Sequence, residues 1–443
     1  MRWIPLRGLR WLVPGLGVKR WAFLAFLSMG AVSGAVLLAF GSGFARTMIR
    51  VAPPGSWQQA AWAGGLLLLG LTGFTLSLVH LVRSVAKAVA PRVAEKPSSL
   101  IYQGRILRRG PRIVALGGGS GLSTVLRGLK RTTSNLTAVV TVTDDGGSSG
   151  RLREAIDVLP PGDVRNCLIA LADDEERFAA YFQHRMTGPG EMTGHALGNL
   201  LLVGLEQATG GFDRAVEAMS HFLNIRGQVL PATLDRAQLV ATMEDGERVV
   251  GESRLAADPR RIQAVSLLPE SVQPYERVLR EIKRADLIVL GPGSLFTSVI
   301  PNLLIQGVAE AVEASRAEKL LVANLMTQHG ETDEMTLRDH LAVLNQYVRL
   351  HRFDWLLVNA SRPDEAYLAQ YLGESAEPVV DDLPQPDSYG LTVIREDLLG
   401  TARWAGKQTV KHDPRKLARA IARHTQAFAP YRRRAAGAAE ISP

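Results

Sequence analysis

The stretch Ile113 to Gly128, IVALGGGSGLSTVLRG, joins an apolar run, a glycine-rich turn and a helical pattern without a break. The apolar residues at its start predict a buried strand. Gly117, Gly118 and Gly119 carry no Cβ that would keep a ligand away from the backbone, and the free amides that open the following helix attract phosphate. The stretch therefore predicts a strand, a phosphate-binding turn and a helix, and the rest of the chain is interpreted around it.

The turn matches neither standard nucleotide motif. It reads GGGSG followed by LS, which departs from the strict G-x-G-x-x-G order, and it lacks the lysine of a P-loop. Ser120 offers a hydroxyl, and Gly121 lets the chain turn into the helix. A tight strand-to-helix turn without a ligand is the alternative that this motif alone leaves open.

The charges of the 443-residue chain are unevenly distributed. The chain has 51 Lys and Arg against 43 Asp and Glu, a net charge of +8. Residues 1–109 hold 14 of the basic residues and one acidic residue, Glu95, which leaves 37 basic and 42 acidic residues in the remaining 334. Because the body of the protein is mildly acidic, we expect no nucleic-acid partner.

Two long apolar stretches lie within the basic N-terminal part. Trp21 to Ala45 runs 25 residues without a charge, and Gln59 to Val82 runs 24 residues with His80 as its one titratable group. Each is long enough to cross about 30 Å of hydrocarbon as a helix. A signal peptide is a poorer reading of the first stretch, which is too long and has no cleavage site before a polar chain. Residues 21–82 are therefore predicted to form a two-helix transmembrane hairpin.

The flanking charges predict the orientation of this hairpin. Basic residues are concentrated in 1–20 and 83–109, whereas the connection Arg46 to Gln58 has two. By the positive-inside rule both flanks are cytoplasmic, so both termini and the main domain face the cytoplasm at the inner membrane. We interpret 83–109 as a linker resting on anionic membrane lipid and 426–443 as a flexible basic tail. One cysteine, Cys167, excludes an intramolecular disulfide and agrees with a reducing compartment.

From residue 110 to 425, strand-like runs alternate with helical patterns. This alternation predicts a Rossmann-like, doubly wound, mainly parallel α/β sheet. After 113–117 and LTAVVTVT (136–143), the strand candidates are 261–268, 286–291, 319–325 and 354–360, each a nearly continuous apolar run typical of strands covered on both faces. Helices are predicted up to Lys130 and over 177–183, 199–207, 212–223, 275–284, 303–315 and 336–346. Leu234 to Ser253 alternates around Asp245-Gly246 and predicts an inserted β-hairpin.

Polar residues follow the predicted strands, at the edge of a parallel sheet where ligands bind. After 136–143 comes a glycine-serine loop from Asp144 to Arg151, which includes Asp145 and Gly146. The two carboxylates are candidates for holding Mg²⁺ or for accepting hydrogen bonds from sugar hydroxyls, and Arg151 and Arg153 for clamping a phosphate. An Asp-Gly turn with solvated charges is the alternative.

Further candidates lie in two motifs, LPPGDVRN and GHALGN. In the first, Asp163, Arg165 and Asn166 enter a helix, for which a capping aspartate with a surface arginine is the alternative. In the second, His195 and Asn199 stand about one helical turn apart, and a lone histidine is weak evidence for a metal. No base accompanies Cys167, which favours a small buried apolar role over that of a nucleophile.

A second glycine-rich turn, GPGSLFTS from Gly291 to Ser298, repeats the order of strand, turn, hydroxyls and helix. It contributes Gly293, Ser294, Phe296 and Thr297 as candidates. Asn324, Thr327, Gln328 and His329 end the next strand, and Asn359, Ser361 and Arg362 end the one after it. Polar side chains at five strand ends favour a ligand site over chance.

Together, GGGSGLSTVLRGLK, TVTDDGGSSGRLR, LPPGDVRNCLIAL, GHALGNLLL, LGPGSLFTSVIPNLL and NLMTQHGET resemble the YvcK family of gluconeogenesis factors (also called GlmR) within the CofD-like superfamily. The resemblance covers about residues 110–425 and does not extend to the apolar hairpin. In this superfamily one branch transfers a phospholactyl group to a deazaflavin. The YvcK branch is associated with binding UDP-N-acetylglucosamine (UDP-GlcNAc) and with control of cell-wall precursor supply and cell shape. The motifs DDGGSSGRLR and PPGDVRN of this chain are similar to those of that branch.

The resemblance implies roles for several residues. Gly118 to Gly121 would hold the ligand's phosphates, with Asp144, Asp145 and Arg151 near the sugar diphosphate, and Asn199 with Gly293 to Thr297 would complete the pocket. Two departures concern nucleotide contacts: Phe296 stands where the family usually has Tyr, and His329 where it commonly has Pro. The sequence thus predicts a membrane-tethered regulator that binds UDP-GlcNAc and controls carbon flow into peptidoglycan precursors, with a cell-wall precursor enzyme as expected partner.

The second hypothesis is a Mg²⁺-dependent transferase of phospho- or nucleotidyl groups at the same loops, with Asp144 and Asp145 as candidate catalytic residues. The sequence does not decide whether the protein is an enzyme or a sensor. It also does not decide whether the protein is a monomer or a homo-oligomer.

Overall fold

The computed structural model describes residues 18–40, 57–89, 107–255, 258–364, 376–384, 388–404 and 407–430. The chain divides into two units, Met1–Arg105 and Ile106–Pro443. Most of the predicted outer connection, of the predicted N-terminal segment and of the predicted linker, and the tail beyond residue 430, lie outside the described residues. Each unit is described by itself below.

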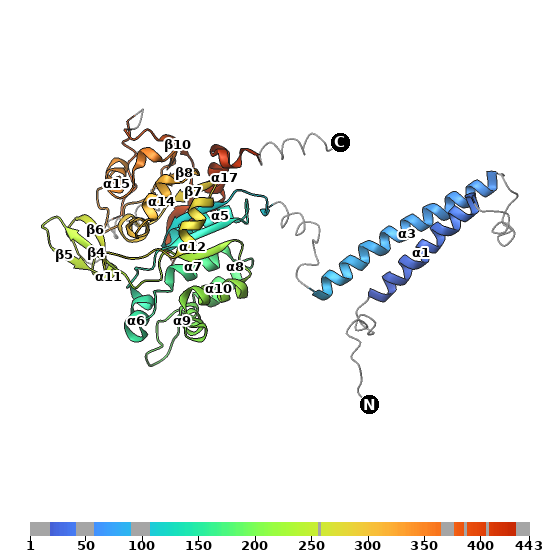
Figure 1. Ribbon diagram of the computed structural model, residues 1–443, viewed down its shortest axis with the longest axis horizontal. Helices are drawn as coiled ribbons and strands as arrows, with labels where there is room; N and C mark the ends of the chain where they lie inside the picture. Colours follow the sequence, from blue (N-terminus) through green and yellow to red (C-terminus); the bar gives the residue numbers. More distant parts are fainter. Residues whose placement is uncertain are drawn as a thin grey trace. The chain divides into compact units, whose positions relative to one another are not determined.

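The first unit consists of two long helices that pack side by side (Figure 1). These are α1 (Val18–Phe40) and α3 (Trp57–Val89). They run antiparallel, since Trp21 near the start of α1 stacks on His80 near the end of α3, with ring centroids 4.1 Å apart. In the described part of the chain, two helices are long and apolar enough to cross a membrane, over Arg20–Ala39 and Ala60–Leu81. The second helix continues past residue 83, into the segment predicted as linker.

The second unit is built on a parallel sheet, which confirms the predicted fold class. The described strands of this sheet number seven and lie in the order β10-β9-β8-β7-β1-β2-β3, each pair parallel. Their bounds are β1 (Ile113–Gly117), β2 (Leu136–Val140), β3 (Gln228–Pro231), β7 (Leu287–Leu290), β8 (Glu318–Val322), β9 (Trp355–Asn359) and β10 (Thr392–Glu396). The strand order reverses between β1 and β7, the place where ligands bind in open α/β sheets.

Strand β1 shows why the sheet is covered on both faces. Alternate side chains of a strand point to opposite faces. Ile113 and Ala115 belong to the hydrophobic core on one face of the sheet, whereas Val114 and Leu116 belong to the core on the other. All four are almost completely buried. The continuous apolar run is therefore explained by two cores, as predicted for a doubly wound sheet.

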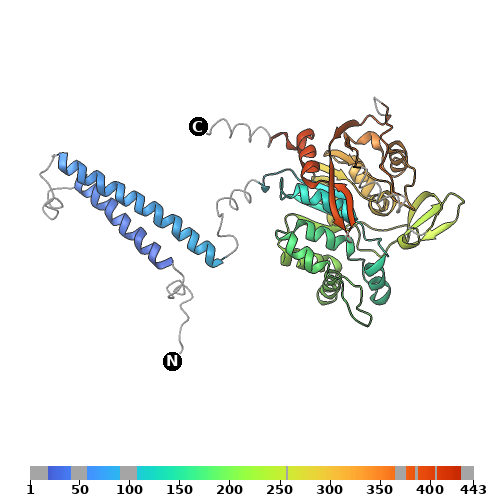
Figure 2. The same ribbon diagram turned by 180° about the vertical axis from the view of Figure 1, so that it is seen from behind.

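Helices cover the two faces of this sheet (Figure 2). Their bounds are α5 (Gly119–Leu129), α6 (Gly147–Ile156), α7 (Gly162–Leu171), α8 (Glu175–Phe182), α9 (Leu197–Thr209), α10 (Phe212–Leu223), α12 (Glu276–Arg284), α13 (Ile300–Leu304), α14 (Val308–Ala314), α15 (Leu337–Leu344) and α17 (Pro414–His424). The predicted helix over 303–315 is wrong in one respect, because Gly307, with φ +78°, separates α13 from α14 and the chain bends by 81°. The segment predicted as a glycine-serine loop turns helical at Gly147.

A three-stranded antiparallel sheet, in the order β5-β4-β6, is inserted between β3 and β7. It contains β4 (Gln238–Met243), β5 (Arg248–Val250), the short helix α11 (Glu252–Leu255) and β6 (Ile262–Leu268). The predicted hairpin is confirmed. The prediction that 261–268 is a strand covered on both faces is wrong. Strand β6 pairs antiparallel with β4, and alternate residues along it are partly exposed.

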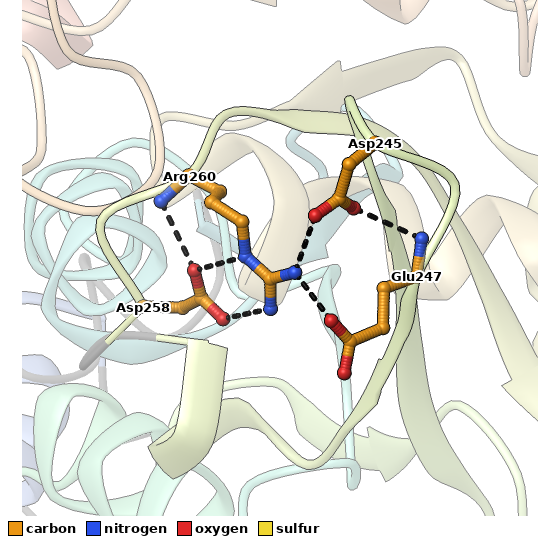
Figure 3. Close-up of polar contacts among 4 residues, drawn as sticks. All are labelled: Asp245, Glu247, Asp258 and Arg260. Atoms are coloured by element: carbon orange, nitrogen blue, oxygen red, sulfur yellow. Dashed lines mark hydrogen bonds and ion pairs between the residues drawn. The ribbon is translucent and has the colours of Figure 1, made fainter.

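Arg260 connects two loops within this insertion (Figure 3). Its guanidinium donates to Asp258 after α11 and to Asp245 and Glu247 in the β4–β5 turn, at 2.5–2.9 Å. These hydrogen bonds raise the pKa of Arg260 above its usual value and lower the pKa of Asp258 to about 2. The cluster therefore ties the β4–β5 turn to the chain that follows α11.

The C-terminal part adds a two-stranded antiparallel sheet, β11 (Leu399–Trp404) with β12 (Lys407–His412), and then α17. Helix α17 begins with Asp413 as its N-cap, which accepts from the amides of Arg415 and Lys416. A further short 3₁₀ turn, Gln426–Phe428, buries Phe428. The packed chain thus runs on into the first residues of the segment predicted as a tail.

Candidate functional site

A cavity of ≈ 470 Å³ lies at the carboxyl ends of β1, β7 and β8. Its volume is within the range of small-molecule sites. Glycine turns, carboxylates, hydroxyls and amides make up most of its wall. The lining residues are Gly118, Gly119, Ser120, Gly121, Thr124, Asp144, Asp163, Glu252, Pro292, Gly293, Ser294, Thr297, Ser298, Asn324, Leu325, Met326, Thr327, Gln328, Val410, Lys411 and His412.

The first glycine turn connects β1 with α5 and is held by a carboxylate. The amide of Gly119, which has φ +58°, donates to Asp163 Oδ2 at 2.6 Å. A Cβ on Gly118 would come within 2.6 Å of the same oxygen. Asp163 therefore occupies the position in which the turn would receive an anion, and it fixes the turn from the start of α7.

The second glycine turn follows β7 and touches the first. A Cβ on Gly121 would lie 2.3 Å from the carbonyl oxygen of Pro292, so the two turns approach at backbone distance. Asn324, at the end of β8, accepts from the Gly293 amide at 3.1 Å and donates to the Gly293 carbonyl at 2.8 Å. The turn is thereby fixed by the neighbouring strand.

Glu331 supports the second turn from behind the cavity. This residue is 7% exposed. Its carboxylate accepts from Ser294 Oγ, from Thr297 Oγ1 at 3.2 Å and from Gln328 Nε2 at 2.8 Å. Burial raises the pKa of Glu331, and the hydroxyl bonds oppose that rise. Three polar side chains of the cavity wall thus share one buried acceptor, which the sequence reasoning did not select.

Three carboxyl groups face the cavity from different elements. Burial and the charge of Asp144 raise the pKa of Asp163 to about 6. Burial also raises the pKa of Asp144, against a hydrogen bond from the Gly146 amide. Glu252 of α11 is affected most, because burial and the charges of Asp144 and Asp163 raise its pKa to about 9. At neutral pH this wall therefore has fewer negative charges than carboxyl groups.

Several predicted site residues do not line the cavity. Asp145 turns toward the inserted sheet, where its Oδ1 accepts from the Ser253 amide at 2.8 Å. Arg151 reaches the Thr193 carbonyl at 3.1 Å, and Arg153 donates to the Ala237 carbonyl at 2.8 Å. Gly146 caps helix α6. Asp144 is thus the one residue of the predicted loop, Asp144 to Arg151, that faces the cavity.

Four other candidates form a polar network beside the cavity. Arg165 donates to Asn199 Oδ1 at 2.6 Å and to Asn166 Oδ1 at 2.9 Å. The Asn199 amide donates to Ser148 Oγ at 3.0 Å, and Ser148 contacts His195 Nδ1 at 3.0 Å. Burial lowers the pKa of both Arg165, to about 10, and His195. The network joins α7, α9 and α6, so its members position the elements that carry Asp163 and Asp144.

The remaining candidates are placed as follows. Phe296 is 1% exposed and belongs to the hydrophobic core, so the missing tyrosine hydroxyl concerns the core. Gly117 ends β1, and its carbonyl accepts from Thr141 and Asn302. Gly291 precedes the second turn with φ +73°. His329 is exposed and its Nδ1 lies 3.2 Å from Asp333.

The wall includes residues that the sequence reasoning missed. Glu252 comes from the inserted sheet, and Val410, Lys411 and His412 come from β12 near the C-terminus. Neither segment carries a glycine turn after a buried apolar strand, the pattern that indicates the other loops of the wall. Burial and the positive charge of Arg127 lower the pKa of Lys411. A search for ionisable residues in every strand, edge sheets included, would have found Lys411 and His412 of β12, whereas Glu252 lies in the short helix α11.

The donor set bears on a metal site. In the described ranges, no group of three or more His, Cys, Asp or Glu side chains is placed to hold a metal ion. The predicted pair Asp144 and Asp145 does not converge, since Asp145 points away from the cavity. Asp144 alone fits the usual arrangement of Mg²⁺, which takes one or two carboxylates together with ligand phosphates and water.

Comparisons with known proteins agree with this architecture. Residues 113–399 match the family model described as 2-phospho-L-lactate transferase CofD. A Bacillus subtilis protein described as a gluconeogenesis factor is 44% identical over 308 residues, which are 70% of this chain and 96% of that protein. A crystal structure of a Bacillus halodurans protein has a TM-score of 0.67 and 43% identity, and covers 70% of this chain and 99% of that one.

A longer relative also shares the N-terminal part. A gluconeogenesis-factor relative in a Nostoc species is 39% identical over 427 residues, which are 93% of this chain and 91% of that protein. This match is too long to fit within residues 106–443 alone. The similarity therefore extends beyond 110–425, the limits expected from the motifs.

Proposed function

Because the chain belongs to the CofD family, among its gluconeogenesis-factor members, we propose that it is a regulatory protein that binds UDP-GlcNAc. The observation that carries the proposal is the meeting of two glycine turns, from adjacent strands at the reversal of strand order, in the wall of one cavity. Such a place suits a ligand that contains both phosphate and sugar. Amides and hydroxyls there can donate to phosphate, and the neighbouring carboxyl groups can accept from sugar hydroxyls.

The wall divides into parts that match the ligand. The Gly119 amide already donates to Asp163, so the amides of Ser120 and Gly121 and the amino group of Lys411 are the groups that suit a diphosphate. Asn324, Gln328 and the carboxyl groups of Asp144 and Glu252 suit hydroxyls and an N-acetyl group. A ligand that spans both parts accounts for the mixture of donors and acceptors.

A divalent cation would reconcile the diphosphate with the carboxylates. Asp144 and the phosphates of the ligand would hold Mg²⁺, which would add positive charge to that of Lys411 in the wall. We therefore expect tighter binding of UDP-GlcNAc in the presence of Mg²⁺. The residues of the chain orient the sugar and keep the turn amides directed into the cavity.

The N-terminal helices suggest where this regulation takes place. Two helices with the length and composition of membrane spans precede the ligand domain. We propose that they anchor the protein in the inner membrane, with both termini in the cytoplasm. There the bound nucleotide sugar would control carbon flow into peptidoglycan precursors, and hence cell shape, through contact with a cell-wall precursor enzyme.

The alternative is a transferase of phospho- or nucleotidyl groups. The presence of Asp144 and Asp163 beside the first glycine turn favours it, because a Mg²⁺-dependent transfer places carboxylates next to phosphates. Turnover of a nucleoside triphosphate with a phosphosugar, lost in Asp144→Ala, would support this alternative. Binding of UDP-GlcNAc without turnover supports the regulator.

Two adjacent aspartates provide the sharpest test of the proposed site. UDP-GlcNAc is titrated by calorimetry into the full chain in mild detergent, with and without Mg²⁺. Asp144→Asn should weaken binding about tenfold, since it removes a charged acceptor from the wall. Asp145→Asn, the matched control, should bind like the wild type because Asp145 faces away. Equal losses in both variants would contradict the placement of the ligand, and absence of binding at millimolar concentration would overturn the proposal.

A further inference from the structure

The amino-end edge of the parallel sheet, opposite the cavity, carries a basic surface. Strands β8, β7, β1 and β2 are neighbours in the sheet. Their first residues lie side by side, because Ile113 pairs with Leu136 on one side and with Leu287 on the other, and β8 starts beside β7. An exposed basic side chain precedes each of these four strands. These residues, which we call the basic edge, are Arg108, Arg109, Arg112, Arg131, Lys283, Arg284 and Arg316.

Hydrogen bonds join the segments that carry the basic edge. The Ser134 amide donates to the Leu107 carbonyl at 3.0 Å, which joins the turns before β1 and β2. The Asp286 amide donates to the Arg112 carbonyl at 2.8 Å, which joins the segments before β1 and β7. The Ser315 hydroxyl donates at 3.0 Å to a carbonyl in the last turn of α12, which joins the segments before β7 and β8. The basic edge is therefore one continuous part of the fold.

The exposed charge of these segments is almost entirely positive. Four acidic residues also occur in them, over 107–112, 131–135, 281–286 and 313–318. Of these four, Asp286 alone is exposed, and its Oδ2 accepts from the Arg112 amide at 2.8 Å. Glu313 is paired with Arg349, outside the basic edge. Solvent at this edge therefore meets seven basic side chains and one acidic side chain, although the sequence beyond residue 109 is mildly acidic.

The chain enters the second unit at this same edge. Residues 83–109 contain seven basic residues and one acidic residue, and the last two basic residues, Arg108 and Arg109, belong to the basic edge. Helix α3, which has the composition of a membrane span, ends at Val89. The cavity lies at the carboxyl ends of the strands, so a partner on the basic edge would leave the cavity free.

We propose that the basic edge binds the anionic headgroups of membrane lipid. Guanidinium groups donate two parallel hydrogen bonds to phosphate, and basic clusters beside membrane helices are attracted to anionic lipid. The sequence connects this edge to two apolar helices, which favours lipid over a soluble polyanion. The inference goes beyond the nucleotide-sugar site and rests on the proposed anchoring for the identity of the partner. Binding there would hold the cavity on the side away from the lipid.

The test measures which edge approaches the lipid. The full chain is reconstituted in phosphatidylcholine nanodiscs, with or without phosphatidylglycerol, that contain a lipid with a nitroxide on its headgroup. A fluorophore is attached to Ala314→Cys, exposed beside Arg316, or to His329→Cys, exposed after the carboxyl end of β8. Cys167 is buried and stays unlabelled. Phosphatidylglycerol should increase quenching at position 314 about twofold or more and leave position 329 nearly unchanged. Equal quenching at both positions, or no effect of phosphatidylglycerol, overturns the inference.

Two charge reversals with the same change in net charge separate the surface from the total charge. Lys283→Glu/Arg284→Glu alters the basic edge, whereas Arg248→Glu/Arg254→Glu alters exposed residues of β5 and α11. Each basic residue near an anionic surface contributes about fivefold to partitioning, so the first variant should lose most of the phosphatidylglycerol-dependent quenching and the second should keep it. About 1 M NaCl should remove this quenching from the wild type. Equal losses in both variants contradict the inference.

Loss of fold is controlled by thermal melting and by a milder variant. Lys283→Gln/Arg284→Gln removes the two charges without adding negative ones, and its quenching should lie between those of the wild type and the charge reversal. It replaces the charge reversal if that variant does not melt cooperatively. Wild-type quenching in a folded Lys283→Gln/Arg284→Gln protein, together with wild-type quenching in the charge reversal, overturns the inference.

Chromatography of the nanodiscs distinguishes this inference from the proposed function. Protein that elutes with phosphatidylcholine discs has inserted its helices; if it shows no phosphatidylglycerol-dependent quenching, the inference fails and the anchoring stands. Protein that elutes with phosphatidylglycerol discs alone, and not as Lys283→Glu/Arg284→Glu, contradicts the anchoring and supports the inference. Retention of an RNA oligonucleotide without any preference for phosphatidylglycerol would assign the basic edge to nucleic acid and overturn the inference. UDP-GlcNAc is absent throughout, so its site is tested separately.

Discussion

The two glycine turns at the sheet edge look alike in sequence but are held in opposite ways. The first, at Gly119, is held by Asp163, a carboxyl group that itself faces the cavity. The second, from Gly293 to Thr297, is held by Asn324 and by the carboxylate of Glu331 behind the wall. The carboxyl group that supports the first turn lines the cavity, where a ligand can contact or displace it, whereas the carboxylate that supports the second turn, Glu331, does not line the cavity.

This difference separates stability from recognition. Substitutions that disturb the backbone contact or the support behind the second turn should cost mainly folding free energy. Substitutions in the support of the first turn should change mainly the charge of the cavity. Thermal and chemical unfolding of the full chain in mild detergent distinguishes these effects.

The largest effect is expected from Gly121→Val, which removes the contact between the turns. Its Cβ would lie 2.3 Å from the Pro292 carbonyl, a backbone atom that cannot move aside alone. We expect a loss of about 3 kcal/mol or more of unfolding free energy and no UDP-GlcNAc binding. Gly204→Ala is the control, since Gly204 lies in α9 with open space around its Cβ position. Near-wild-type stability of Gly121→Val would refute the contact.

Glu331→Ala tests the support of the second turn. It leaves Ser294, Thr297 and Gln328 without their shared acceptor, so we expect a loss of about 2–3 kcal/mol in unfolding free energy. The exposed Glu310 on α14 provides a control substitution to alanine with little expected change. A loss of ligand affinity with unchanged stability would contradict the assignment of Glu331 as a support.

Asp163→Asn tests the support of the first turn through pH. The pKa of Asp163 is raised from 3.8 to about 6, so the folded protein holds its proton more tightly than the unfolded chain. Wild-type stability should fall as pH rises from about 4 to about 6 and stay lower above that. Asparagine carries no charge and keeps an acceptor for Gly119, so the variant should gain about 1–2 kcal/mol at pH 7.5 and nothing below pH 4. Parallel pH curves for both proteins would disprove this.

The smallest effect is expected from Arg260→Ala, outside both turns. Its partners are Asp245, Glu247 and Asp258 (Figure 3). The side chains of Asp245 and Glu247 are exposed, whereas that of Asp258 is 13% exposed. Exposed ion pairs contribute little and are screened by salt. We expect a small decrease in melting temperature that disappears at 1 M NaCl. A large decrease, insensitive to salt, would show that the insertion is fastened more tightly than its exposure suggests.

The parts of the fold that sequence could predict are those with a local cause. β1 and β7 are continuous apolar runs because both faces of the sheet are covered, and each ends in a glycine turn. β6 has a similar composition, but its exposed alternate residues belong to an edge sheet, and a short apolar run does not distinguish the two. The start of α6 was not predicted because its first residues are glycine and serine, which are typical of loops. It follows a turn in which Asp144 accepts a hydrogen bond from the Gly146 amide.

The site was predictable to the extent that it follows strand ends. Both glycine turns, Asp144 and Asn324 line the cavity as their positions after strands suggested. Glu252 and His412 reach the same cavity from an insertion and a C-terminal hairpin, and only the tertiary fold brings them there. Asn199 and His195 also belong to a glycine-containing polar motif. In the structure, however, they form hydrogen bonds that connect helices and do not line the cavity.

The central claim is that the two turns form one nucleotide-sugar site. Calorimetric titration of the full chain with UDP-GlcNAc in the presence of Mg²⁺ tests it most directly. The account predicts saturable binding of one ligand per chain, weakened by Asp144→Asn and unchanged by Asp145→Asn. No heat of binding at millimolar UDP-GlcNAc, from protein that melts cooperatively, would contradict it.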